Sequence, residues 1–286
     1  MVLRRDRSGV VAVGQASHAW LCGQLARAWG NARFAPVRPL DEVALGAEQH
    51  DVGMARWDLD PIRNPDTGLP QSFMEMGADV NAGLWTRGPV RLVTQSRYGA
   101  LLAIMHGRRL YERHDLAAAS PRDAPVIRAF LGHARELESS LLASLRDDPA
   151  TAPYAAPPVV ERNSRLVWIW DQISLALLLD WAPMRLESVP GTGDERVDVA
   201  LEPVAQETSG STDAVSVVSL NPWPFAASSV HVHCEGRRLG HGFADDGALA
   251  EGLARAPWET VEFALVAGDD SEPAPSTDRA AYDPER

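Results

Sequence analysis

The strongest constraint on the fold is one long apolar segment that contains a single carboxylate in its middle. Residues 166–181 read LVWIWDQISLALLLDW, inside a helical pattern that we expect to run from about 160 to 181. Most of the circumference of this helix is apolar, so other elements must pack around it. Asp171 has Val167 and Leu175 one helical turn away and should be buried. A buried carboxylate without a partner is costly, so we expect an arginine, backbone donors or a cation beside it.

Four further segments have helical spacing and indicate a helical domain that extends to about residue 185. They are SHAWLCGQLARAWG from Ser17, EVALGAEQHDVG up to Gly53, SRYGALLAIMHGRRLYERHD, and APVIRAFLGHARELESSLLASLRDD. Residues 57–82 are rich in Pro, Asp, Gly and Asn and predict a long loop. Long ordered loops are often functional, so we expect this loop to cover a pocket and set specificity. The loop residues that we single out are Asn64, Asp66, Gly68, Pro70 and Ser72.

After residue 185 the pattern changes to short β-branched runs broken by Gly, Pro and Asn. The first 14 residues predict a hairpin, and an isolated hairpin is only marginally stable. We therefore expect it to join the C-terminal strands in a small β subdomain over residues 186–267, with a short helix at ALAEGLARA. The acidic, Pro-rich residues 268–286 predict a disordered tail. The expected fold class is mainly α, a helical bundle over residues 1–185 with a small β subdomain packed on it.

Composition narrows the classes of partner. The formal net charge of −12 excludes a general attraction to nucleic acid or anionic lipid. All 27 basic residues are Arg, so no Lys can form a Schiff base, and a phosphate must be held by Arg, metal or backbone N–H. The two cysteines, Cys22 and Cys234, are compatible with a reducing cytoplasm. The apolar run at 166–181 is shorter than the roughly 20 residues that span a bilayer, and GVVAVG is too short for a signal peptide. We expect a soluble, cytoplasmic protein.

Several histidines lie where helices should be buried or should end. His106 has apolar neighbours, a setting more typical of a hydrogen-bonded core histidine than of a ligand. His18 lies in the first turn of its helix, where the helix dipole disfavours imidazolium and keeps the ring able to bind a metal. His50 and Asp51 are adjacent at the end of the next helix. Such a pair is either two ligands of one metal ion or two polar residues near a helix end.

The order of His18, His50–Asp51 and Asp171 on successive helices resembles the HD superfamily of metal-dependent phosphohydrolases. Among families related to this superfamily, the chain most closely resembles one bacterial family, the domain-of-unknown-function family 3891. The similar stretches, from about residue 3 to 266, are GQASHAWLCGQLARAWG, EQHDVGMARWD, PDTGLPQSF, SRYGALLAIMH, WDQISLAL and NPWPF. The resemblance implies an HD-domain-like helical bundle in which His18, His50, Asp51 and Asp171 bind a divalent metal. It carries over no established activity from that family.

The remaining histidines are weaker candidates for ligands. Superfamily members with two metals have further histidines before the last Asp, and His106 and then His133 are the candidates here. The pair His114–Asp115 in YERHDLAA has charged neighbours, and we interpret it as a solvated helix end. His231 and His233 share one face of an expected strand but lack a convincing fourth ligand for zinc, so we interpret them as a polar strand face.

A site of nitrogen and carboxylate ligands suits Fe, Mn, Zn, Co or Mg, as one or two ions. Such an ion lowers the pKa of a bound water, and Asp51 or the nearby Asp58 is placed to accept its proton. We assign catalysis to Asp51 and His106, with His106 also as an additional metal ligand. Arg108 and Arg109 either direct an anion to the metal or lie at the surface. The residues assigned to substrate binding are Arg109, Trp57 and Tyr98.

The function expected from the resemblance is hydrolysis of a phosphoester, nucleotide-like, through a metal-activated water. One alternative is a mixed di-iron oxygenase of the same superfamily, in which His106 and His133 supply the extra ligands. A second alternative is a non-catalytic binding or regulatory protein with a structural metal, whose NPWPF segment lies in the interaction surface. The expected partner is a small anionic substrate rather than nucleic acid or membrane, and a homodimer is compatible with the sequence.

Overall fold

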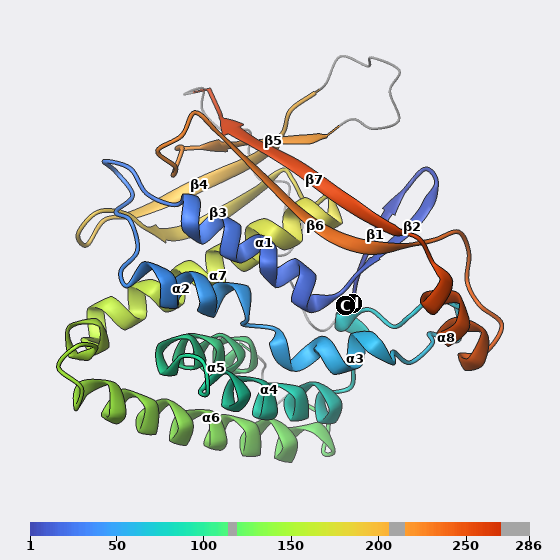
Figure 1. The fold of residues 1–286 in the computed structure, drawn as a ribbon, viewed down its shortest axis with the longest axis horizontal. Helices are drawn as coiled ribbons and strands as arrows, with labels where there is room; N and C mark the ends of the chain where they lie inside the picture. The colour runs from blue at the N-terminus through green and yellow to red at the C-terminus, as the bar shows by residue number, and fades with distance from the viewer. Residues whose placement is uncertain (114–118, 206–214, 270–286) are drawn as a thin grey trace.

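The structure is a computed structural model that describes residues 1–113, 119–205 and 215–269, and it combines one sheet with a stack of helices (Figure 1). The helices are α1 (Gln15–Ala28), α2 (Leu40–Glu48), α3 (Ala55–Leu59), α4 (Ala78–Leu92), α5 (Arg97–Glu112), α6 (Asp123–Arg146), α7 (Pro157–Leu179) and α8 (Asp246–Arg255). Short 3-10 turns are η1 (Val52–Met54), η2 (Phe73–Glu75) and η3 (Ala152–Ala155). The strands are β1 (Val2–Asp6), β2 (Gly9–Val13), β3 (Met184–Pro190), β4 (Arg196–Pro203), β5 (Ser216–Asn221), β6 (Ser229–Leu239) and β7 (Trp258–Ala267).

The seven strands form one mixed sheet in the order β1-β2-β6-β7-β5-β4-β3. Only the β5–β7 pair among these strands is parallel, and the others are antiparallel. Strand β2 pairs with β6, with Val10 opposite Leu239 and Val13 opposite Gly236. The expected union of the N-terminal hairpin with the C-terminal strands is therefore confirmed.

The expected mainly α bundle is wrong. About 49% of the described residues are helical and 22% are in strands, and the sheet curls into a half-barrel rather than forming a small appendage. The physical reason is that each β-branched run is short and interrupted, so the sequence gives only a weak signal for each strand. The sheet pairs segments from both ends of the chain, and an alternating pattern predicts a strand without predicting which strands pair with it.

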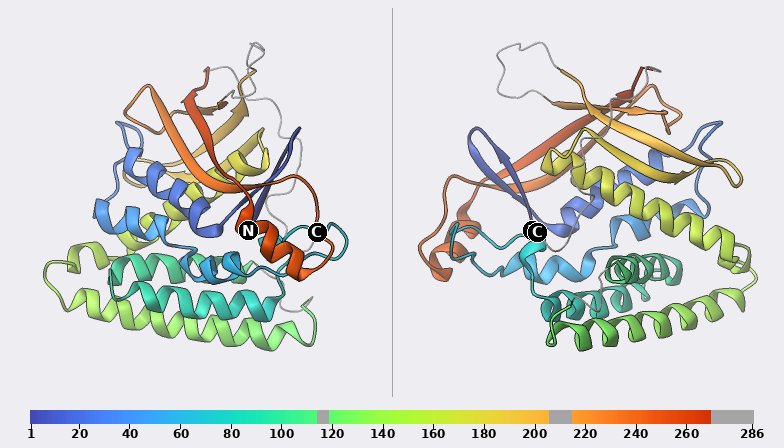
Figure 2. Two further views of the ribbon diagram at one scale, coloured as in Figure 1. Left: turned by 45° about the vertical axis from the view of Figure 1, so that its right-hand side comes forward. Right: turned by 180° about the vertical axis from the view of Figure 1, so that it is seen from behind.

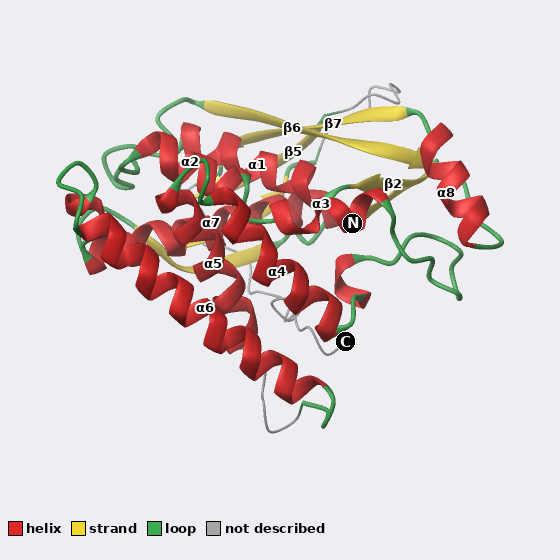
Figure 3. Ribbon diagram, turned by 60° about the horizontal axis from the view of Figure 1, so that its bottom comes forward, coloured by secondary structure: helices red, strands yellow, loops and turns green. Residues whose placement is uncertain are grey.

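The helices are stacked in layers below the sheet. Helix α1 packs on β6, and α7 contacts β1, β3 and α1. Helices α2 and α5 lie beneath them, and α4 and α6 close the far side (Figure 1). Figure 3 shows the strands gathered on one side of the molecule and the helices on the other. Seen from behind, α7 runs directly under the gold strands of the sheet (Figure 2).

Helix α7 lies at the centre of the core, as its apolar circumference predicts. Ile169, Trp170 and Ile173 are fully buried, and Asp171 is only 6% exposed. The largest apolar cluster joins residues of this helix with sheet residues such as Phe263. Apolar area removed from water is the main stabilising contribution to folding, and here it is shared between the two layers. The helices and the sheet thus share one core.

Several expected element boundaries shift in the structure. Helix α1 begins at Gln15 rather than at Ser17, and the Ser17 hydroxyl instead pairs with the backbone of Glu235 on β6. Helix α2 ends at Glu48, before the His-Asp pair. Helix α4 was not expected, because its start lies in the polar segment that predicted a loop and Pro89 interrupts its second half.

None of the described helices combines the length and apolar character needed to cross a bilayer. Nearly all of the predicted tail, residues 270–286, lies outside the described residues.

Two glycines let the turn that follows Asp51 lie against α4. A Cβ at Gly88 would lie 2.7 Å from Cα of Gly53, and a Cβ at Gly53 would collide with the carbonyl oxygen of Leu84. Real Cβ contacts are not this short, so the two backbones must separate if either glycine gains a side chain. By contrast, a Cβ at Gly132 on α6 would meet nothing within 4 Å.

These contacts predict opposite effects for two glycine-to-alanine substitutions in helices. Gly88→Ala should lower the free energy of unfolding by about 1–3 kcal/mol through overpacking. Gly132→Ala should raise it by about 0.5–1 kcal/mol, because alanine loses less backbone entropy in a helix. Urea unfolding monitored by circular dichroism measures both, and equal effects at the two positions would contradict the close approach of η1 and α4.

Candidate metal centre

Four polar side chains from three parts of the chain meet in the interior between α1, α7 and the turn after α2. His18 is in the first turn of α1, Asp171 is in the middle of α7, and His50 and Asp51 lie between α2 and η1. None of the four is more than 6% exposed. The resemblance implied these four as ligands, and the structure places them together.

The distances between their donor atoms fit one shared ion. They are 3.2 Å from His18 Nε2 to Asp171 Oδ1, 3.4 Å from His18 Nε2 to Asp51 Oδ2, 3.4 Å from His50 Nε2 to Asp171 Oδ1, and 3.6 Å from His50 Nε2 to Asp51 Oδ2. Donors that lie about 2.1 Å from a common ion are roughly 3.0 to 3.4 Å from one another in octahedral or tetrahedral geometry. Small movements of these side chains would therefore complete a coordination sphere.

Hydrogen bonds hold His50 in the tautomer that a metal requires. Its Nδ1 lies 2.7 Å from the carbonyl oxygen of Ala47, so Nδ1 carries the proton and donates it there. Nε2 is then unprotonated in the neutral ring, and it has no hydrogen-bond partner among the described residues. A buried nitrogen lone pair without a donor is costly, and a cation would satisfy it.

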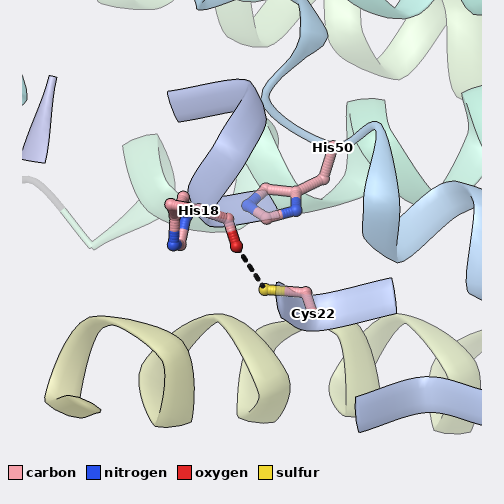
Figure 4. A group of neighbouring side chains, drawn as sticks. All are labelled: His18, Cys22 and His50. Carbon is pink, nitrogen blue, oxygen red and sulfur yellow. Dashed lines mark hydrogen bonds between the residues drawn. The ribbon is translucent and has the colours of Figure 1, made fainter. Parts of the chain in front are cut away.

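A serine on α7 holds His18 in the same tautomer, with the proton on Nδ1. The Ser174 hydroxyl donates to the carbonyl oxygen of Asp171 at 2.9 Å, so it must accept the proton of His18 Nδ1, which is 2.7 Å away. The Cys22 thiol lies 3.4 Å from Ser174 Oγ and 3.9 Å from the His18 carbonyl oxygen (Figure 4). Cys22, His18 and His50 have donor atoms within 4.8 Å of one another. Burial and the Asp171 charge raise the pKa of the Cys22 thiol well above its usual range, so we place it as a support of Ser174.

The carboxylates share protons with the imidazoles in the metal-free site. Burial opposes ionisation of Asp171, but the neighbouring imidazoles of His18 and His50 hold the pKa of its carboxyl well below the usual range. Burial would lower the pKa of His18, but hydrogen bonds to Asp171 and Asp51 raise it to about 9. A metal ion must displace such protons to reach its ligands.

His106 lies just beyond the four. Its Nε2 is 3.9 Å from Asp171 Oδ2, farther than the contacts within the quartet. The ring lies against His50, Trp85 and Trp168, with centroid distances of 4.6, 5.6 and 5.6 Å. Burial and the neighbouring His50 lower the pKa of His106 to about 4, so the ring is neutral near pH 7. It can serve as a base or as a fifth ligand.

Gln15 links the quartet to the start of α1. Its Nε2 donates to Asp51 Oδ2 at 3.1 Å, and its buried Oε1 has no hydrogen-bond partner in the described part of the chain. Asp58 accepts the backbone N–H of Gln15 at 2.6 Å, and its other oxygen lies 3.2 Å from the amino group of Met1. These contacts give Asp58 a structural role at the beginning of α1.

A cavity of about 420 Å³ opens onto three residues of the quartet. Its lining includes the metal-side residues His18, Asp51, Asp171 and His106, together with Gln15. Much of the remaining wall comes from α4, α5, α7 and the segment 73–78. The loop over residues 57–82 thus reaches the cavity only through its last part. The five loop residues singled out from the sequence are not among the described lining residues.

The three residues assigned to substrate binding lie elsewhere. Trp57 belongs to an apolar cluster, and the Tyr98 hydroxyl donates to the Tyr154 carbonyl oxygen at 3.2 Å. Arg109 pairs with Glu161 at 2.9 Å. None of the three is among the described residues that line the cavity.

The other histidine candidates do not join the donor groups. His133 is absent from the groups of close metal donors found among the described residues. His231 and His233 alternate with buried residues of β6 and are exposed, as expected for a polar strand face. The pair His114–Asp115 lies outside the described residues.

Sequence reasoning missed the residues that support the ligands. Gln15 precedes His18 by three residues, Cys22 follows it by four, and Ser174 follows Asp171 by three. On a helix these spacings place side chains on the same face as the ligand. That spacing is a signal that could have identified all three.

Removal of a ligand should remove the metal. His50→Ala and Asp171→Asn should each lower metal content by at least about tenfold at limiting metal, because the site loses one of four donors. His233→Ala, a histidine on the exposed face of β6, is the matched control and should leave metal content unchanged. Elemental analysis after dialysis measures this, and equal metal content in all four proteins would refute the site.

The raised pKa of His18 predicts how stability changes with pH. The unfolded imidazole titrates near 6.5, so the contribution of the protonated ring is complete below that pH and is lost as pH rises through about 9. The metal-free protein should therefore lose stability, on the order of 3 kcal/mol, across this window. The increase in melting temperature on adding metal should grow over the same window, because fewer protons compete. A metal-free melting temperature that rises from pH 6.5 to 9 would contradict the proton-sharing site.

Comparisons with known proteins agree with the motif-based resemblance at the level of the family. A family described as "Protein of unknown function (DUF3891)" matches residues 1–241. No curated protein and no solved structure shows a significant match to the chain. Because the match covers most of the chain, including all four proposed ligands, the protein belongs to the DUF3891 family.

Proposed function

We propose that this protein is a metal-dependent hydrolase whose ion is held by His18, His50, Asp51 and Asp171. The observation that carries the proposal is the set of four His-to-Asp distances of 3.2 to 3.6 Å within the quartet, three of whose residues, His18, Asp51 and Asp171, line a cavity. The order of these ligands along the chain, which resembles that of the HD superfamily, supports the same conclusion by analogy. The bond that we propose from this resemblance is a phosphoester.

The donor set narrows the metal without selecting one. Two imidazoles and two carboxylates suit Fe, Mn, Zn, Co or Mg. We propose one ion, because the further close donors among the described residues are only His106 and Cys22, and the raised pKa of the Cys22 thiol disfavours the thiolate that would bind a metal. A second ion would need further ligands, and His133 is not in the groups of close metal donors among the described residues.

The residues around the site have separate tasks in the proposed hydrolysis. A divalent ion, when bound, supplies Lewis acidity and makes a water molecule nucleophilic near neutral pH. Gln15 Oε1 is an acceptor beside Asp51 and can orient that water. His106, neutral and facing the cavity, can accept the proton at a ring nitrogen. Trp85 and Trp168 flank His106 and limit access of bulk water to it.

A substitution at His106 separates metal binding from catalysis. His106→Gln should lower kcat for hydrolysis of bis(p-nitrophenyl) phosphate by about 100-fold or more, since a positioned base contributes that order of rate. Metal content should stay near that of the wild type, because the four closest donors remain. Elemental analysis and steady-state kinetics on the same samples measure both quantities.

The control is Arg109→Ala, which removes a side chain paired with Glu161 outside the cavity and should leave kcat unchanged. Bound metal without hydrolysis of any phosphoester or carboxylic ester by the wild type would instead favour a structural metal. Two irons per chain with O₂ uptake would favour the oxygenase alternative.

A further inference from the structure

More of the described residues that line the cavity are apolar than polar. Three tryptophans, Trp85, Trp168 and Trp181, line it together with aliphatic residues such as Leu110, Ile127 and Leu175. Methionines 54, 74, 76 and 184 add flexible thioethers that adapt to irregular ligands. A surface of this kind gains free energy mainly by removing apolar ligand area from water.

Apart from the histidines, the charged side chains among the described residues that line the cavity are all acidic. No arginine is present among the described residues that line it, and the chain contains no lysine. Three carboxylates line it: Asp51, Asp171 and Asp123. The two negative charges of Asp51 and Asp171 would neutralise a divalent cation bound between them. No net positive charge would then remain to attract a second anionic group of the substrate. Asp123 adds repulsion.

The arginines that follow His106 along the chain are already engaged. Arg108 pairs with Glu138 at 2.8 Å and with Glu112 at 2.7 Å. Arg109 pairs with Glu161, as described above. Arg113 is exposed and lies over the ring of Trp168 at 5.1 Å, where the aromatic face holds its charge. Because recognition of di- and triphosphates requires several arginine, lysine or backbone donors, this cavity is poorly suited to them.

We propose that the substrate has a mainly apolar organic body and at most one negative charge, in contrast to a nucleoside di- or triphosphate. This inference rests on the proposed function for the reacting group of the substrate, which must reach the metal ligands. For the remainder of the substrate it rests on the residues of the cavity wall. The cavity volume of about 420 Å³ is within the range of small-molecule sites. A single phosphodiester or carboxylic ester with an apolar group satisfies both requirements.

Alkyl hydroxamic acids provide the test, because their head group chelates divalent metals and their tail length can be varied. Titration calorimetry of the Zn²⁺-loaded protein should show affinity that increases from acetohydroxamate to octanohydroxamate, by up to about fourfold for each methylene. Pyrophosphate and ADP should bind no more tightly than acetohydroxamate. Affinity independent of tail length, or pyrophosphate tighter than octanohydroxamate, would overturn the inference.

A cation introduced into the wall should reverse the preference. Leu110→Arg, on the half-buried part of α5 that lines the cavity, should weaken octanohydroxamate at least tenfold and strengthen pyrophosphate. Met76→Arg is a second variant with the same expectation, in case the first does not fold. Val90→Arg, at a position on α4 that is 46% exposed, is the matched control and should change neither affinity. Unchanged preferences in both cavity variants would overturn the inference.

Failure of the proposed function has a different signature. Octanamide has the same tail as octanohydroxamate without the chelating head. If the metal assignment alone fails, the two compounds bind equally well, while the dependence on tail length persists. If the inference alone fails, acetohydroxamate binds only to the metal-loaded protein, and added methylenes change nothing.

Arg113→Ala should leave every affinity unchanged. A selective loss of pyrophosphate binding would show that this arginine recognises anions and would overturn the inference.

Discussion

The burial of one carboxylate in the central helix governs the rest of this structure. Asp171 lies among buried apolar residues of α7 such as Trp170 and Ile173, where an isolated charge would be strongly destabilising. Two imidazoles, from His18 and His50, approach one of its oxygens at 3.2 and 3.4 Å. Because these come from α1 and from the turn after α2, the same contact sets the positions of three elements. A divalent ion at this point would relieve the cost of the buried charges and retain the geometry.

The layered fold places this cluster at the end of a cavity without exposing it. The sheet covers α1 and α7 on one side, and α2 and α5 cover them on the other. The layers share one apolar cluster, so that the ligands rest on a rigid support. The hydrogen bonds of His18 to Ser174 and of His50 to Ala47 then orient the rings. A site with such supporting contacts binds its ion with less reorganisation than one built on loops.

The four candidate ligands came from the resemblance to the order of His, His-Asp and Asp in the HD superfamily. Helical periodicity alone placed His18 and Asp171 on helices and left the pair at 50–51 undecided. The substrate-binding assignments at Trp57, Tyr98 and Arg109 had no comparable ligand pattern behind them. Arg109 follows His106 by three residues, a spacing that favours a shared helix face, but its side chain pairs with Glu161 and is not among the described residues that line the cavity.

The sequence by itself determined that α7 would be buried, that most of the other helices would form and that the first hairpin would need partner strands. Only the tertiary structure decided that these strands form a seven-stranded sheet, that α4 forms and supplies part of the cavity wall, and that no described lining residue is an arginine. The physical reason is the range of the interactions. Helical and strand periodicity records the environment of residues a few positions apart. Strand order, cavity walls and ion pairs depend on contacts between segments far apart in the chain, for which one sequence contains no comparable signal.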